Sequence, residues 1–272
     1  MADIKVWAMY FSPTGTTKKI VTQIANDVGA YMGVKINTLD FTPPMVRNEG
    51  QSFSQNDIVI FGVPVYAGRV PNILLKYLST VVGGGAVAVP VVLYGNRNYD
   101  DSLIELRNIL QNNGFKTIAA GAFVGEHSFS KTLGKNRPDE KDLKVAKDFA
   151  HEIANKIING NIGNIPVKVR GEDPIRGYYQ PRDRKGNSID IRKVKPKTNN
   201  KCNNCGICVK VCPMGSINSE NVSEVIGICI KCGACIKKCP QEAKYYDDKN
   251  YLYHKEELEQ EFQRRAEPEI FL

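Results

Sequence analysis

The stretch of sequence that decides the fold lies near the start of the chain, where residues 4–17 read IKVWAMYFSPTGTT. Residues 4–11 form an apolar run without a helical period, which is typical of a parallel strand buried on both faces. A loop of hydroxyl side chains around one glycine follows at 12–17, and apolar residues then recur at helical spacing from Ile20 to Val28. The order of strand, polar loop and helix predicts the first unit of an α/β fold.

The same alternation of strand and helix continues through residue 160. Further apolar strands are predicted at 34–39, 57–63, 86–94 and 116–124, with helices at about 71–80, 100–112 and 139–159. Such alternation favours a five-stranded parallel sheet with helices on both faces. Right-handed connections suit the doubly wound strand order 2-1-3-4-5. Residues 1–160 are therefore predicted to form one doubly wound α/β domain.

The rest of the chain is organised differently. Residues 161–198 contain several prolines and glycines and are interpreted as an extended linker. Residues 199–272 are predicted to form a small α+β domain with a terminal helix at 252–265. A unit of this size does not easily stabilise itself by burial alone and usually needs a covalent or metal staple. All eight cysteines lie in it, between Cys202 and Cys239.

Composition limits the classes of function. The N-terminus has no signal-peptide pattern and no apolar run approaches 18 residues, so we expect a cytoplasmic protein without a membrane span. In a reducing compartment, clustered cysteines are metal ligands before they are disulfides. The net charge of +8 comes mostly from residues 161–200, which hold 10 Lys and Arg against 4 Asp and Glu. No basic stripe carries interleaved aromatic residues, so nucleic-acid binding is not expected.

The cysteines form two copies of one motif, C-x-x-C-x-x-C-x-x-x-C followed by proline, 27 positions apart. The first copy is Cys202, Cys205, Cys208 and Cys212, and the second is Cys229, Cys232, Cys235 and Cys239. Three thiolates on a tight loop can reach three irons of one cubane, and the fourth reaches the neighbouring cubane. Structural zinc at paired C-x-x-C knuckles would not explain the third cysteine or the C-x-x-x-C-P ending. The spacing therefore predicts two [4Fe–4S] clusters.

Residues 199–245 resemble bacterial-type two-cluster ferredoxins in this motif and its repeat. The crossed ligand pattern of such proteins assigns Cys202, Cys205, Cys208 and Cys239 to one cluster. It assigns Cys229, Cys232, Cys235 and Cys212 to the other.

The hydroxyl-rich loop after the first strand is a candidate phosphate site. A helix N-terminus offers unpaired N–H groups and a positive dipole end. The loop contains no lysine or arginine and matches neither the NTPase nor the dinucleotide motif. A phosphate monoester bound by neutral donors suits it, while an ordinary helix cap remains the alternative. The candidate residues are Ser12, Thr14, Gly15, Thr16 and Thr17.

Two further loops follow the third and fourth strands and should flank the phosphate loop at the carboxyl ends of the sheet, where ligands bind. Each offers a tyrosine and small or amide residues, which suit the face and edge of a flavin ring. The candidates are Pro64, Val65, Tyr66, Ala67, Gly68, Gly95, Asn96, Arg97, Asn98, Tyr99 and Asp100. His127, after the fifth strand, could donate a hydrogen bond to a ligand, but a cap or turn is its expected role.

Residues 1–160 resemble flavodoxin, because residues 12–17 match that family's S/T-x-T-G-x-T motif with Thr16 where asparagine is common. The resemblance implies FMN, with its phosphate at 12–17 and its ring at the Tyr66 and Tyr99 loops. The whole chain resembles fused flavodoxin–ferredoxin proteins. It implies electron transfer between two clusters and FMN, which couples one- and two-electron carriers.

Two other functions remain open from the sequence. One is a flavin-dependent reductase that passes electrons to dioxygen, a quinone or an organic acceptor, and the other is a redox sensor. The expected partners are ferredoxin-type donors or acceptors; a small-molecule acceptor and a homodimer are also compatible with the sequence. A flexible tether would be richer in glycine and serine than the linker. Its aromatic and basic residues instead predict a segment that docks, namely Tyr178, Tyr179, Arg182, Arg184, Arg192 and Lys193.

Overall fold

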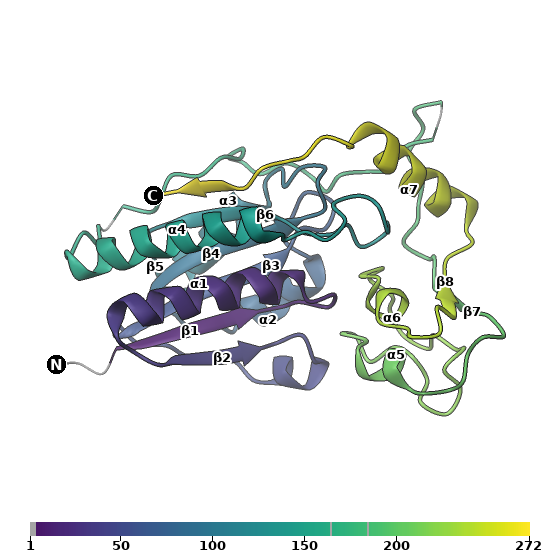
Figure 1. The fold of residues 1–272 in the computed structure, drawn as a ribbon, viewed down its shortest axis with the longest axis horizontal. Coiled ribbons are helices and arrows are strands. Elements are labelled where there is room, and N and C mark those ends of the chain that lie inside the picture. Colours follow the sequence, from purple (N-terminus) through teal and green to yellow (C-terminus); the bar gives the residue numbers. More distant parts are fainter. Residues whose placement is uncertain (1–3, 164, 184) are drawn as a thin grey trace.

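The computed structural model describes residues 4–163, 165–183 and 185–272 and shows a large α/β unit with a smaller unit at one end (Figure 1). The elements of the large unit are β1 (Lys5–Tyr10), α1 (Thr16–Met32), β2 (Ile36–Asp40), η1 (Pro44–Asn48), β3 (Asp57–Pro64), η2 (Asn72–Leu74), α2 (Leu75–Leu78), β4 (Val87–Tyr94), α3 (Ser102–Asn112), β5 (Lys116–Thr117), β6 (Ala120–Val124) and α4 (Glu140–Ile158).

The sheet of the large unit has the predicted doubly wound order. Strands β2, β1, β3, β4 and β6 are neighbours in that sequence, and all these pairs are parallel. The fifth predicted strand is divided into β5 and β6, both of which pair with β4. The carboxyl ends of the parallel strands point toward the small unit (Figure 1).

Helices cover both faces of this sheet because its strands are apolar on both sides. Along β1, Val6, Ala8 and Tyr10 pack in one buried cluster with α1 and α4. Met9 alternates with them and packs in a second cluster with α2 and α3. The helix predicted at 71–80 is shorter than expected and consists of η2 followed by the single turn of α2.

The small unit is built around the cysteine repeat. Its elements are β7 (Lys197–Thr198), α5 (Ile207–Lys210), α6 (Ala234–Lys237) and β8 (Lys244–Tyr245), and β7 pairs antiparallel with β8. Gly206 and Gly233 precede the two short helices with φ of 73° and 72°, so the two halves share one backbone conformation. The buried apolar cluster is small and includes Cys208, Ile217, Val222 and Cys235. Metal ligation is the staple that the size of this unit requires.

The C-terminal segment returns to the large unit. Helix α7 spans Lys249–Glu261, starting and ending slightly earlier than predicted, and β9 (Glu269–Phe271) then pairs antiparallel with β6. The sequence placed all of 199–272 in the second domain, and the structure differs at β9. Three residues are too few to show a strand period, so the pattern gave no sign of this pairing.

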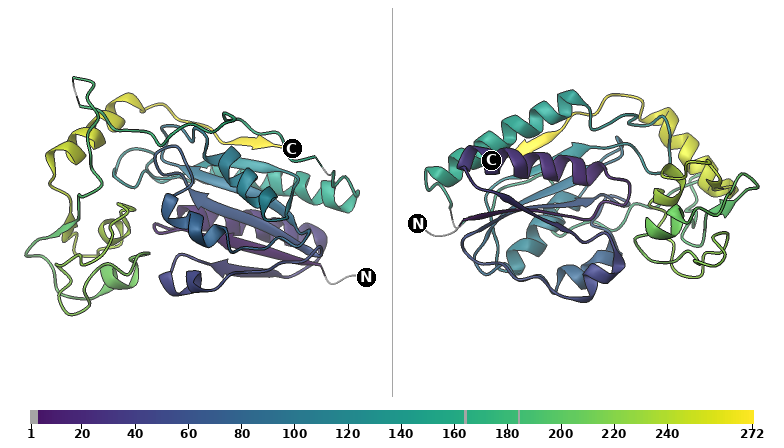
Figure 2. Two further views of the ribbon diagram at one scale, coloured as in Figure 1. Left: turned by 180° about the vertical axis from the view of Figure 1, so that it is seen from behind. Right: turned by 60° about the horizontal axis from the view of Figure 1, so that its bottom comes forward.

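The linker docks on the large unit through Arg176 and the predicted residues Tyr178 and Tyr179. Arg182 and Arg192, also predicted to dock, bond to Gly186 and Asp190 within the linker. The side chain of Arg176 binds the buried carboxylate of Asp101 with an Nε–Oδ2 distance of 2.9 Å, and its backbone N–H donates to the same carboxylate at 2.8 Å. Hydrogen bonds from Arg176 lower the pKa of Asp101 to about 2. Tyr178 donates its hydroxyl to the carbonyl of Val70 at 3.0 Å. Figure 2 shows the linker and the C-terminal segment running side by side as the two connections between the units. Arg184 lies outside the described residues.

Candidate functional site

The loop before α1 leaves the first N–H groups of the helix available to a ligand. Gly15 occupies the N-cap position with a φ of 102°, a conformation that glycine adopts without strain, and as glycine it has no side chain of its own to cap the helix. The hydroxyl of Ser12 accepts from the N–H of Lys18 at 2.9 Å beneath the loop. Backbone donors and threonine hydroxyls of this loop can therefore hold a phosphate.

A cleft lies at the carboxyl ends of the parallel strands and encloses about 450 Å³ of empty space, part of it open to solvent. Residues from four loops of the large unit and one cysteine of the small unit line it. They are Pro13, Thr14, Thr16, Thr17, Pro64, Val65, Tyr66, Leu93, Tyr94, Gly95, Gly125, Glu126, His127, Ser128 and Cys232. This is the edge of the sheet where doubly wound proteins bind their ligands.

The structure brings seven of the predicted flavin-site residues together in this cleft. These are Thr14, Thr16, Thr17, Pro64, Val65, Tyr66 and Gly95. Gly95 approaches His127 so closely that an added Cβ would lie 2.3 Å from the imidazole Cδ2, so glycine is required there. Threonine hydroxyls at one end and apolar and aromatic groups at the other suit a phosphorylated ring compound.

The remaining loop predicted to hold the ring, residues 96–100, contacts the C-terminal segment instead. Asn96 donates to the carbonyls of Phe262 and Arg264 at 2.7 Å each and accepts from the N–H of Ala266 at 3.1 Å. Tyr99 is buried in the core and donates its hydroxyl to Glu269 at 2.7 Å.

Neighbouring members of the predicted set also have partners outside the cleft. Arg97 pairs with Asp100 and lies 4.4 Å from the ring centre of Tyr179. Asn98 accepts from the N–H of Asp100 at 3.0 Å. Gly68 packs against the Asp100 side chain, and the exposed Ala67 accepts from the N–H of Tyr179 at 2.8 Å. The sequence could not show the contacts with Tyr179 and the C-terminal segment, because they depend on where these distant segments return.

Two titratable groups in the cleft are held neutral. Burial, with the nearby thiols of Cys232 and Cys229, raises the pKa of Tyr66 well above its ordinary value, so its phenol stays protonated. Burial also lowers the pKa of His127 to about 3, helped by the charge of Lys237. The His127 Nδ1 accepts from the N–H of Phe129 at 3.1 Å, so the neutral ring carries its proton on Nε2. His127 thus makes the expected turn contact and also lines the cleft.

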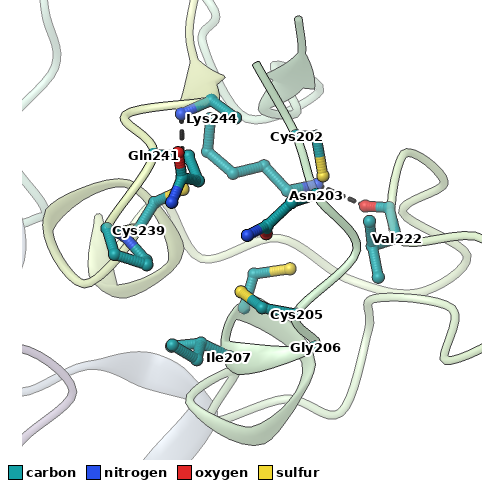
Figure 3. Close-up of a pocket in the computed structure, with 12 residues that line it drawn as sticks. Cys202, Asn203, Cys205, Gly206, Ile207, Val222, Cys239, Gln241 and Lys244 are labelled. Carbon is teal, nitrogen blue, oxygen red and sulfur yellow. Dashed lines mark hydrogen bonds between the residues drawn. The ribbon is translucent and has the colours of Figure 1, made fainter. Parts of the chain in front are cut away.

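The eight thiols are free and surround two cavities in the small unit. One cavity is lined by Cys202, Cys205, Cys208 and Cys239 (Figure 3). The other is lined by Cys212, Cys229, Cys232 and Cys235. Each set combines three cysteines of one motif with the last cysteine of the other, and four thiolates around a cavity are the donor set of a cubane cluster. The residues therefore fit two [4Fe–4S] clusters in the crossed arrangement.

The small unit packs against the mouth of the flavin-site cleft. An added Cβ at Gly233 would lie 2.5 Å from the carbonyl oxygen of Ser128. Lys237 pairs with Glu126 and donates to the carbonyl of Ser130 at 2.8 Å. Arg47 donates to the carbonyl of Pro213 on the opposite side. These contacts place Cys232 in the cleft wall, a position that no signal in the sequence indicates.

Three residues that line the cleft were not among the predicted flavin-site residues, although their positions in the sequence pointed to the cleft. Gly125, Glu126 and Ser128 follow the fifth predicted strand, on the side of the sheet where ligands bind. Tyr94 ends β4 and contributes to the same wall. A rule that takes the last residue of every parallel strand and the first residues after it would have found all four.

Comparisons with known proteins agree with this architecture. A family model described as "Flavodoxin domain" matches residues 8–125, and one described as "4Fe-4S dicluster domain" matches residues 201–244. An uncharacterised protein of Methanocaldococcus jannaschii is 26% identical over 144 residues, which cover 50% of this chain and 89% of that protein.

Solved structures similar to the chain include two flavodoxins. One comes from the domain Archaea, with 15% identity, coverage of 57% of this chain and 99% of that one, and a TM-score of 0.42. Another, from Streptococcus pneumoniae, has 18% identity, coverage of 56% and 99%, and a TM-score of 0.40.

Fold, cleft and cysteine cavities together define an electron-transfer flavo-iron–sulfur protein. The chain is a flavodoxin–ferredoxin fusion, in which a flavodoxin domain takes FMN and a 4Fe-4S dicluster domain takes iron–sulfur clusters. No helix among the described residues is both long enough and apolar enough to cross a membrane.

Proposed function

We propose that this protein transfers electrons within one chain, between FMN in the cleft and the cluster held by Cys212, Cys229, Cys232 and Cys235. One observation carries the proposal: Cys232 lines both the second cysteine cavity and the cleft that contains the phosphate-loop threonines. FMN accepts one or two electrons and a cluster accepts one, so their proximity joins two-electron to one-electron chemistry.

The chain's own residues bind and orient the flavin in this proposal. The hydroxyls of Thr14, Thr16 and Thr17, with backbone N–H groups around Gly15, hold the phosphate. The side chains after β3 and β4, above all Tyr66 and Tyr94, enclose the ring. Tyr66 and His127 carry no charge near neutral pH, so they offer neutral hydrogen-bond donors to the ring edge.

The cluster held by Cys202, Cys205, Cys208 and Cys239 is the one open to a partner. Cys205 and its neighbours Asn203 and Asn204 are exposed, whereas the other cavity faces the large unit. We place a one-electron redox protein of the ferredoxin type at this surface. Cys202, Cys205, Cys208 and Cys239 would hold the outer cluster, and Cys212, Cys229, Cys232 and Cys235 the inner cluster beside the cleft. With these groups and FMN bound, the arrangement would let single electrons move between the partner and FMN in either direction.

Rapid mixing with an external reductant tests transfer within the chain. After the clusters are reduced, they should equilibrate with FMN at a rate that does not depend on protein concentration. A rate that rises linearly with protein concentration would mean that the cluster reaches FMN by collision between molecules, which contradicts the proposal.

A pair of variants makes the test specific to the docked position. Lys237→Ala removes the contacts with Glu126 and Ser130 and should slow equilibration. Lys238→Ala changes the neighbouring exposed lysine, which carries no ion pair among the described residues, and should leave the rate unchanged. Equal rates for both variants and the native protein would show that this contact does not hold the cluster at the flavin.

A further inference from the structure

The two halves of the cysteine repeat differ in charge at one buried position. An offset of 27 residues relates Gly206 to Gly233 and Pro213 to Pro240. The same offset relates Ile217 to Lys244. An apolar side chain in the first half is therefore replaced by a cationic one in the second, at positions that are 5% and 3% exposed.

These two side chains lie beside different cysteine cavities. Lys244 lines the cavity of Cys202, Cys205, Cys208 and Cys239, and its Nζ donates to the carbonyl of Val222 across that cavity (Figure 3). Ile217 lines the cavity of Cys212, Cys229, Cys232 and Cys235. The repeat thus places a buried cation against the outer site and a hydrocarbon at the corresponding place of the inner one.

A buried cation acts strongly on a nearby anionic site because little water screens it. Lys244 is 3% exposed and lines the same cavity as the thiols of Cys202, Cys205, Cys208 and Cys239. The ammonium therefore favours negative charge on the surrounding sulfur atoms.

We infer that Lys244 raises the reduction potential of the outer cluster above that of the inner one. Each one-electron reduction adds one negative charge to a site that is already anionic, and no bond or proton need change. The donor is the inner cluster or an external one-electron carrier. The outer cluster is then the preferred resting place of a single electron. This inference rests on the two ligand sets proposed above.

Two other polar contacts act on the inner site and oppose this order. Lys231 donates to the carbonyls of Cys229 and Arg192 at 3.0 Å each, but it is only half-buried and does not line the cavity. The hydroxyl of Tyr246 lies 3.8 Å from the sulfur of Cys229, a long contact. Solvent weakens the first and distance weakens the second, so the fully buried Lys244 dominates.

Potentiometric titration followed by EPR tests the inference. Lys244→Ile restores the residue of the first half. It should reduce the equilibrium constant for one cluster's reduction at least tenfold, about 59 mV for one electron, and change the other less. Lys231→Asn, which restores the residue of its own repeat partner Asn204, is the matched control and should produce a smaller shift. Lys244→Arg keeps the charge and should keep the native potentials.

The outcomes separate electrostatics from structure. If Lys244→Ile loses iron, Lys244→Met removes the charge while keeping a long apolar stem, and its two potentials decide the question. Unchanged potentials in the charge-removing variants, or a shift no larger than that of Lys231→Asn, would overturn the inference. A failure of the ligand sets themselves would appear separately, as loss of the wrong cluster in single-cysteine variants.

Discussion

At the scale of single residues, the loop before α1 divides its hydroxyl groups between the fold and the ligand. Ser12 is 7% exposed, and its hydroxyl already accepts from the N–H of Lys18. Its own N–H donates to Thr42 at 2.7 Å. Thr14 and Thr16 instead line the cleft. Neighbouring hydroxyls in one motif therefore have different tasks, which substitution can distinguish.

Thr14→Val should weaken binding of FMN about tenfold, because one donor to the phosphate is lost. Riboflavin lacks the phosphate, so its affinity should change little. Flavin fluorescence titration measures both. Ser12→Ala is the comparison. It should lower the melting temperature of the flavin-free protein and leave the ratio of the FMN and riboflavin affinities nearly unchanged. Equal losses for FMN and riboflavin in Thr14→Val would contradict a phosphate contact.

At the scale of elements, the short helices α5 and α6 each carry cysteines to both cavities. Cys208 lies within α5 and lines the outer cavity, while Cys212, shortly after the same helix, lines the inner one. The N–H groups of Ser216 and Ala243 approach the sulfurs of Cys212 and Cys239 at 3.4 and 3.3 Å. Cys212 and Cys239, each the last cysteine of its motif, therefore accept a matching backbone hydrogen bond.

Cys212→Ala should damage the inner cluster and leave the outer one largely intact. Cys239→Ala should do the opposite, because that cysteine follows α6 but lines the outer cavity. Iron content and EPR of each variant measure the result. If Cys212→Ala instead removed the cluster of Cys202, Cys205 and Cys208, the crossed assignment would be incorrect.

The sequence predicted the helices and strands well where their formation depends on residues close by in the chain. The succession of strand, loop and helix in residues 4–32, the helical period of α1 and the cysteine repeat are all local, and each appears in the structure as expected. The places where prediction and structure differ are long-range. Tyr99 and Asn96 follow β4, as ring-binding residues should, but the C-terminal segment occupies them. Nothing within a few residues of either position carries that information.

At the scale of the whole molecule, the C-terminal segment holds the small unit to the large one through residues that do not line the cleft. Arg265 pairs with Asp139 at 2.6 Å, and the carbonyl of Ala266 accepts from Arg137 at 3.0 Å. Asn96 donates to the carbonyls of Phe262 and Arg264 and accepts from the N–H of Ala266, and β9 then pairs with β6. Together with the docked linker, this segment limits how far the small unit can move from the flavin site.

A protease site inserted after Gly186, in the exposed turn of the linker, tests this arrangement. The cleaved protein should remain one species in gel filtration under native conditions and separate into two fragments in denaturant. Removal of residues 266–272 should allow the cleaved fragments to separate without denaturant. Separation of the cleaved full-length chain would mean that the C-terminal segment contributes little.

The pairing of β9 with β6 changes how the two domains are connected. Because the chain leaves the sheet after α4 and returns to it at β9, the cluster domain is an insertion within the flavodoxin domain and not an appendage to it. An inserted domain with two fixed ends has fewer accessible orientations than one on a single tether. Exchange of cluster domains between molecules would require both ends to detach, so each flavin should keep the same pair of clusters for the lifetime of the fold.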